Sequence, residues 1–100
     1  MAQIKLNKHE VYSYIATNLE WFTGINGKSV RYLPCSDIGD RINNELQIER
    51  SGESPYIRLS GATLTAMVHD GVLKRTYDDF KHCYRYFPVL PINENYKINK

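Results

Sequence analysis

The sequence predicts a small α+β domain, in which a three-helix core lies beside a small antiparallel sheet. Three segments repeat apolar residues every three or four positions, which is typical of helices with one buried face. A short run before the second segment and two runs after the third are rich in β-branched and aromatic residues, which favours strands. The predicted order is therefore helix, strand, helix, helix, strand, strand.

The composition fits one globular domain. The chain has 100 residues, of which 42% are hydrophobic and 24% charged, so it can bury a core without disulfides or metals. No apolar run approaches the roughly 20 residues of a membrane span, and the first residues lack the apolar stretch of a secretory signal. We therefore expect a cytoplasmic protein without a membrane partner. The predicted domain spans 1–88, and the polar segment 89–100 is predicted to be a partly disordered tail.

The first predicted helix follows Asn7. Asn7 can cap it, and Glu10 stands where it would complete a capping box. Gly24 is expected to end this helix, and the Asn26-Gly27 pair predicts a turn. The predicted buried stripe consists of Val11, Ile15, Leu19 and Phe22.

The first strand and the second helix are separated by a proline. Residues 29–33, SVRYL, are predicted to form a strand with Val30 and Tyr32 on one side, and Pro34 is expected to end it. Ser36 is the predicted cap of the second helix, which is expected to fray near Gln47 before a polar turn at 49–53. Its predicted buried residues are Ile38, Ile42 and Leu46.

The third helix has two possible starts. Ser54-Pro55 combines a capping residue with a proline suited to the first helical position, which favours a helix from there to Gly71. In the alternative, the helix begins at Ser60 and the preceding YIRL is extended. We favour the longer helix, because it gives Ser54-Pro55 a purpose and because Gly61 within it would let a neighbouring element approach closely.

Two β-prone runs follow Gly71. Residues 72–77 and 82–87 are separated by DDFK, which predicts a hairpin. Pro88 and Pro91 are expected to end regular structure.

Residues 54–75 resemble the recognition helix and wing of winged helix-turn-helix transcription regulators. The residues that carry this resemblance are Leu64, Met67, Gly71, Val72, Leu73 and Arg75. The segment 36–42 is similar to the preceding helix of such domains, and as an order of elements the resemblance covers 8–87. It implies a DNA-binding regulator of transcription or replication, with the third helix in the major groove and the hairpin wing on the backbone. Small chains of this kind often belong to phages, prophages or plasmids.

The resemblance places candidate contacts with double-stranded DNA on the third helix and the hairpin. The candidate DNA-binding residues are Tyr56, Arg58, Ser60, Ala62, Thr63, Thr65, Lys74, Arg75, Lys81 and Arg85. Leu59, Ala66 and His69 are expected on the same outward face of the helix. Residues 50–85 hold six Lys or Arg and four Asp or Glu, so the basic excess is small. The alternatives are a solvated helix face, and cross-strand pairing of the hairpin cations with Asp78 and Asp79.

A protein-binding module, such as a phage-type inhibitor or adaptor, is the second hypothesis. The net charge of +2, the acidic hairpin tip and the eight tyrosines favour it. Tyr14 and Trp21 lie seven residues apart, so they share a face of the first helix. They would form either the seam of a homodimer or part of a larger core.

Enzymatic and metal chemistry lack a supporting motif. His69-Asp70 are adjacent on a helix and do not face each other, and no nucleophile or phosphate-loop motif is present. Cys35 and Cys83 are predicted to be thiols, and their spacing to His69 and His82 matches no zinc motif. We therefore expect a non-enzyme that needs no cofactor.

Overall fold

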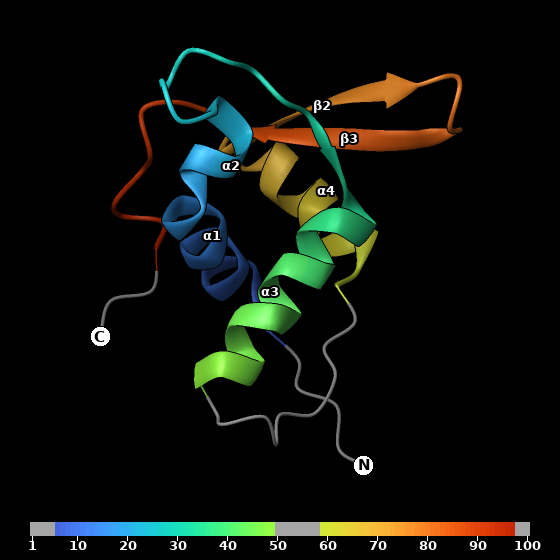
Figure 1. Ribbon diagram of the computed structural model, residues 1–100. Helices are drawn as coiled ribbons and strands as arrows, with labels where there is room; N and C mark the ends of the chain where they lie inside the picture. Colours follow the sequence, from blue (N-terminus) through green and yellow to red (C-terminus); the bar gives the residue numbers. More distant parts are fainter. Residues whose placement is uncertain (1–5, 50–58, 98–100) are drawn as a thin grey trace.

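The computed structural model describes residues 6–49 and 59–97, which form a small α+β domain (Figure 1). Within these residues the helices are α1 (Lys8–Thr17), α2 (Leu19–Thr23), α3 (Cys35–Glu49) and α4 (Gly61–His69). The strands are β1 (Leu33–Pro34), β2 (Leu73–Asp78) and β3 (Cys83–Pro88). The α+β class is confirmed, and so is the order of the predicted elements, except that the first helix is divided in two.

The first predicted helix breaks at Asn18. Its start is as predicted: the Glu10 amide donates to Asn7 Oδ1 over 2.9 Å, and the Asn7 amide donates to Glu10 Oε1 over 3.2 Å. At the break, Asn18 Nδ2 donates to the carbonyl oxygen of Tyr14 over 2.9 Å. Such a side-chain bond offers the backbone an alternative to the helix, so α1 ends here and α2 begins. Gly24, with φ of 75°, ends α2 as predicted.

The first strand is shorter than predicted. The sequence predicted residues 29–33, but β1 is Leu33–Pro34. The Ser29 amide donates to the Thr23 carbonyl over 2.8 Å and the Arg31 amide to the Phe22 carbonyl over 2.9 Å. These bonds tie the segment to the end of α2 instead of to a strand, and Val30 is left 65% exposed. Pro34 belongs to the strand, because β1 is at the sheet edge and needs no amide on its open side.

Helix α3 begins two residues earlier than predicted. It starts at Cys35, so Ser36 lies in its first turn and is not its cap. Ile38 and Ile42 are buried, each 2% exposed, as the periodicity predicted. The helix continues to Glu49, and the side chain of Leu46 lies outside the described residues.

Helix α4 has the later of the two predicted starts. Ser60 is extended, with φ of −86° and ψ of 136°, and its Oγ accepts from the Ala62 amide over 3.1 Å. A continuous helix through Leu59 and Ser60 was therefore the wrong choice, and Ser54-Pro55 lies outside the described residues. A β-carbon at Gly61 would meet nothing within 4 Å. The close approach predicted there is instead found at Gly39, which faces Leu59.

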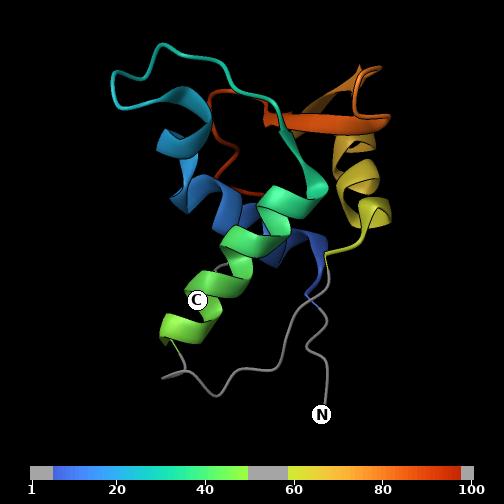
Figure 2. The same cartoon turned by 45° about the vertical axis from the view of Figure 1, so that its right-hand side comes forward.

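The sheet has the order β1-β3-β2, and both pairs are antiparallel. The hairpin strands lie one residue later than predicted, with Leu73 opposite Pro88 and Asp78 opposite Cys83. Gly71, with φ of 82°, turns the chain from α4 into β2. The free end of the hairpin projects beyond the helices (Figures 1 and 2).

One hydrophobic core joins the helices to the sheet. Its buried residues are Val11, Tyr12, Ile15, Phe22, Leu33, Ile38, Ile42, Leu64, Met67, Val72, Leu73, Tyr86 and Phe87. The segment predicted as a tail contacts α1 through Asn93 and Tyr96. The rings of Tyr12 and Tyr96 meet edge to face with centroids 5.1 Å apart, and the Asn93 amide donates to the Tyr12 hydroxyl over 2.8 Å. No helix in 6–49 or 59–97 has the length and apolar content needed to cross a bilayer.

Candidate functional site

The candidate DNA-binding residues that the structure describes fall on the first turns of α4 and on the hairpin (Figure 2). Tyr56 and Arg58 lie outside the described residues. Ser60 and Ala62 are exposed at the start of α4, while Thr63 and Thr65 are half-buried. Leu59, expected on the outward face, instead packs against the core. The start of α4 therefore presents small side chains, and its first amides are capped by Ser60.

Arg75 joins the hairpin to α4. Its Nη1 donates to Thr65 Oγ1 over 3.4 Å, and its guanidinium carbon lies 4.3 Å from the ring centroid of Tyr84. Tyr84 in turn meets Tyr77 edge to face, with centroids 5.1 Å apart. One predicted pair of site residues, Thr65 and Arg75, is thus in direct contact. Lys74 is exposed, but as the neighbour of Arg75 on a strand it points to the opposite face of the sheet.

The hairpin turn is organised by Asp78. Its Oδ1 accepts from the amides of Phe80 and Lys81, each over 3.0 Å, and its Oδ2 accepts from Arg85 Nε over 2.7 Å. The Lys81 amide and the Arg85 guanidinium both stabilise the charged carboxylate, so they lower the pKa of Asp78. Arg85 also donates to the Tyr32 carbonyl over 3.2 Å. Arg85 therefore makes the cross-strand pair that was the alternative to a phosphate contact.

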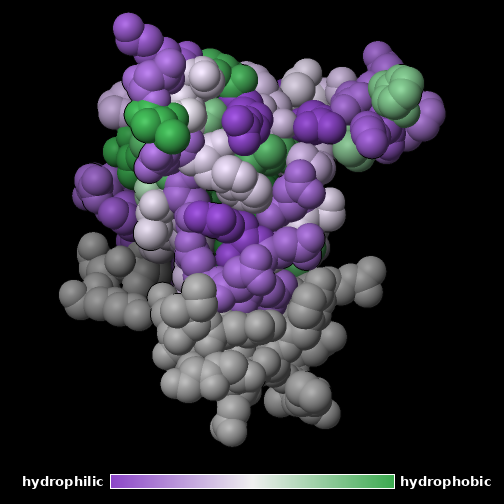
Figure 3. All heavy atoms as spheres, in the orientation of Figure 1, coloured by the Kyte–Doolittle hydropathy of each residue, from purple (hydrophilic) through white to green (hydrophobic). Residues whose placement is uncertain are grey.

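The turn also exposes a residue that sequence reasoning missed. Phe80 is 88% exposed at the tip, where Asp79 and Lys81 are its exposed neighbours. Figure 3 shows a hydrophobic surface at the free end of the hairpin, on a face that is otherwise mostly polar. The sequence signal that could have indicated an exposed Phe80 is its place in the polar turn DDFK. The two flanking strands already supply the apolar residues of the sheet.

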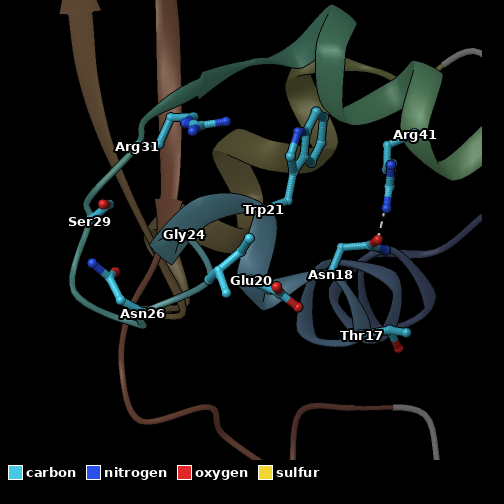
Figure 4. Close-up of a pocket in the computed structure, with 10 residues that line it drawn as sticks. Thr17, Asn18, Glu20, Trp21, Gly24, Asn26, Ser29, Arg31 and Arg41 are labelled. Atoms are coloured by element: carbon cyan, nitrogen blue, oxygen red, sulfur yellow. Dashed lines mark hydrogen bonds between the residues drawn. The ribbon is translucent and has the colours of Figure 1, made fainter.

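A hollow of about 760 Å³ lies between α2, the segment after it, and α3 (Figure 4). Trp21, Arg31 and Arg41 contribute to its lining. The guanidinium carbon of Arg41 lies 5.5 Å from the Trp21 ring centroid, and Arg41 Nε donates to Asn18 Oδ1 over 2.9 Å. Sequence reasoning did not predict this hollow, because its walls come from segments that are separated along the chain.

The predicted dimer seam is partly used within the chain. Tyr14 and Trp21 are both half-buried and pack against the core, which fits the alternative of a larger core. Trp21 also meets Phe22 edge to face, with centroids 5.8 Å apart.

The two cysteines are free thiols in separate places. Cys35 Sγ donates to the Leu59 carbonyl over 3.4 Å, and burial raises the pKa of the Cys35 thiol. In the part of the chain that the structure describes, His, Cys, Asp and Glu form no group of three or more that could hold a metal ion.

Comparison with known proteins found no match: no protein-family model, no curated protein and no solved structure is similar to this chain.

Proposed function

We propose that this chain is a winged helix-turn-helix protein that binds double-stranded DNA and regulates transcription or replication. The order of elements and the sheet order β1-β3-β2 support the fold assignment, since helix α4 directly precedes the hairpin that would be the wing. The observation that carries the proposal is the Arg75–Thr65 contact, which joins an exposed cation of β2 to the middle of α4.

This arrangement suits a duplex for two reasons. The exposed residues at the start of α4, Ser60 and Ala62, are small, so the helix can approach base edges in the major groove. Arg75, held against Thr65 of α4, adds a positive charge that favours contact with phosphate. In this proposal α4 enters the groove, while Arg75 and Lys81 hold the flanking backbone.

The test is a titration of the full chain with a mixed-sequence DNA duplex, followed by amide shifts at low and moderate salt. The proposal expects shifts that cluster at 60–65 and 74–85 and that weaken as salt rises, because phosphate contacts release counterions. Shifts spread evenly over the surface, or none at low salt, would overturn it.

A protein-interaction module remains the second candidate, and Phe80 is the observation that favours it. An aromatic side chain that is 88% exposed on a turn fixed by three bonds to Asp78 resembles the anchors that dominate protein interfaces. The carboxylates of Asp78 and Asp79 beside it disfavour contact with phosphate. This candidate predicts a partner whose binding changes little with salt and is lost in Phe80→Ser but retained in the neighbouring Lys81→Ser.

A further inference from the structure

The hollow beside Trp21 has the lining of a small-ligand site, and its lining residues in the described chain belong to 17–31 and α3, not to α4 or the hairpin (Figure 4). Its volume of about 760 Å³ is within the range of pockets that hold small molecules. Trp21 supplies an aromatic surface, and Ile25, 94% exposed, supplies an apolar one. Two arginines and one glutamate, Arg31, Arg41 and Glu20, supply the charges.

The cationic side of the hollow has guanidinium donors that no carboxylate of the described residues occupies. Arg41 Nε donates a hydrogen bond to Asn18 Oδ1. Neither Arg31 nor Arg41 has a carboxylate of a described residue within 4.0 Å. In Figure 4 the guanidinium of Arg31 points toward Trp21, and Arg41 lies on the other side of the indole. Guanidinium groups bind carboxylate or phosphate with paired hydrogen bonds, so these two favour an anionic group.

The hollow is also held in shape without a ligand. The amides of Ser29 and Arg31 donate to α2 carbonyls, and the Lys28 amide donates to Asn26 Oδ1 over 2.9 Å. A β-carbon at Gly24 would lie 3.1 Å from Ser29 Oγ, which shows how closely the loop folds back on α2. Arg31 therefore projects from a fixed backbone, and less conformational entropy is lost when a ligand binds.

Glu20 limits the kind of ligand. A carboxylate in the same hollow repels an anionic group placed beside it, but it accepts hydrogen bonds from N–H donors. The lining thus favours a ligand that has a flat ring, an anionic group at one end and N–H donors at the other.

We propose that this hollow binds a mononucleotide with an exocyclic amino group on its base. The phosphate would contact Arg31, the base would lie against the face of the Trp21 ring away from Arg41, and the amino group would donate to Glu20. Nucleobase stacking on aromatic side chains and phosphate binding by arginine are both favourable in a partly enclosed site. This proposal is independent of the one for DNA, which uses another surface of the chain.

The experiment exploits the fact that Trp21 is the only tryptophan of the chain. Its fluorescence, excited at the red edge where nucleotides do not absorb, is followed during titration with AMP. The proposal expects saturable quenching, with amide shifts confined to 17–31 and the first half of α3. Adenosine lacks the phosphate and inosine monophosphate lacks the amino group, so both are expected to bind at least about tenfold more weakly. L-phenylalanine carries a carboxylate and an ammonium group on a smaller frame, and is expected to bind more weakly than AMP.

Two variants distinguish binding of AMP in the hollow from non-specific electrostatic attraction to the protein. Arg31→Gln removes a lining guanidinium and is expected to weaken AMP binding about tenfold or more. Lys28→Gln removes the same charge from the same loop, but Lys28 does not line the hollow. This variant is expected to change the affinity for AMP less than twofold at moderate salt. Equal effects of the two variants, equal binding of adenosine, tighter binding of phenylalanine, or no saturable response at millimolar AMP would each overturn the proposal. Amide shifts with DNA would leave this result unchanged, since they concern α4 and the hairpin.

Discussion

Gly39 and Leu59 pack so closely that a β-carbon on Gly39 would lie 3.2 Å from the β-carbon of Leu59. Gly39 is buried within α3, and Leu59 belongs to the non-helical residues that lead into α4. The same segment is bonded to the first residue of α3, since Cys35 Sγ donates to the Leu59 carbonyl. The contact therefore sets how near the start of α4 lies to α3.

Gly39→Ala is expected to destabilise the protein by about 1 kcal/mol. Alanine gains about 1 kcal/mol of helix propensity over glycine, but overpacking a tight contact costs about 1–3 kcal/mol. Leu59 has little room to yield, because its carbonyl is bonded to Cys35 and the next residue caps α4. Denaturant unfolding measures the change.

Gly61→Ala is the matched control for Gly39→Ala. Its added β-carbon meets nothing within 4 Å, so only the gain in propensity remains and the variant is expected to be stabilised by up to about 1 kcal/mol. Equal stabilisation of both variants would show that the contact between Gly39 and Leu59 yields without cost.

Asp70→Asn is expected to lower the melting temperature near neutral pH. Asp70 Oδ2 accepts from Lys8 Nζ over 2.7 Å and from the Tyr96 hydroxyl over 2.6 Å, which joins the end of α4 to α1 and to the last described residues. Lys8 first, and Tyr96 second, lower the pKa of Asp70. A carboxyl with a lowered folded pKa stabilises the fold above its unfolded value of about 3.9, and this contribution is lost as the pH falls through the folded pKa.

The difference in melting temperature between the wild type and Asp70→Asn should therefore close on acidification. The control is Asp79→Asn, whose exposed carboxyl has no hydrogen bond or ion pair to a described residue, so its melting temperature near neutral pH should stay close to that of the wild type. At high pH the cluster of Asp70, Lys8 and Tyr96 predicts a second loss of stability. Burial and the Asp70 carboxylate raise the pKa of Tyr96, so its contribution is present below the unfolded value of about 10 and is lost above it. A wild-type melting temperature that does not change with pH in either the acidic or the alkaline range would contradict this role of the cluster.

Arg75→Gln is expected to weaken binding to all DNA sequences by a similar factor. If Arg75 holds one phosphate, its loss reduces the slope of log affinity against log salt by about 0.9. Its contacts with Thr65 and Tyr84 are on the surface, so the fold should change little. Binding isotherms at several salt concentrations, for specific and random duplexes, measure both effects.

Lys28→Gln makes the same change of charge on the far loop, away from the hairpin. It is expected to leave the salt slope unaltered. If the two variants reduce the slope equally, the attraction to DNA comes from net charge and not from the wing.

Signals that act within a few residues could be predicted from the sequence. Asn7 with Glu10, Gly24 and Gly71 each fix the backbone around them, and each is found as predicted. The start of α4 was ambiguous, because Ser54-Pro55 and Ser60 are both good caps and only the packing of Leu59 on α3 separates them. Two helix starts with equally good capping residues cannot be ranked from the local sequence alone.

The remaining differences come from contacts between distant residues. The strand predicted to begin at residue 29 begins only at Leu33, because two of the earlier amides bond to α2, which no pattern within the segment indicates. In the same way, the pairing of Arg85 with Asp78 was one of two alternatives until the register of β2 and β3 was known. The hollow beside Trp21 was not predicted at all, since it needs the positions of α2 and α3 together.

Asn18→Ala is expected to destabilise the protein by about 1 kcal/mol, because it removes hydrogen bonds from a buried side chain to the half-buried Glu45 and the exposed Arg41. Asn18 is 9% exposed and binds both polar neighbours on α3: its Oδ1 accepts from Arg41 Nε, and its Nδ2 donates to Glu45 Oε1. The isosteric Asn18→Asp separates the two contacts, since it keeps an acceptor for Arg41 but places a second carboxylate against Glu45. We expect Asn18→Asp to be destabilised at neutral pH and to recover as acid protonates the new pair. Denaturant unfolding across this pH range measures both variants, and equal stability of Asn18→Ala and the wild type would show that the contacts between Asn18 and α3 add nothing to the fold.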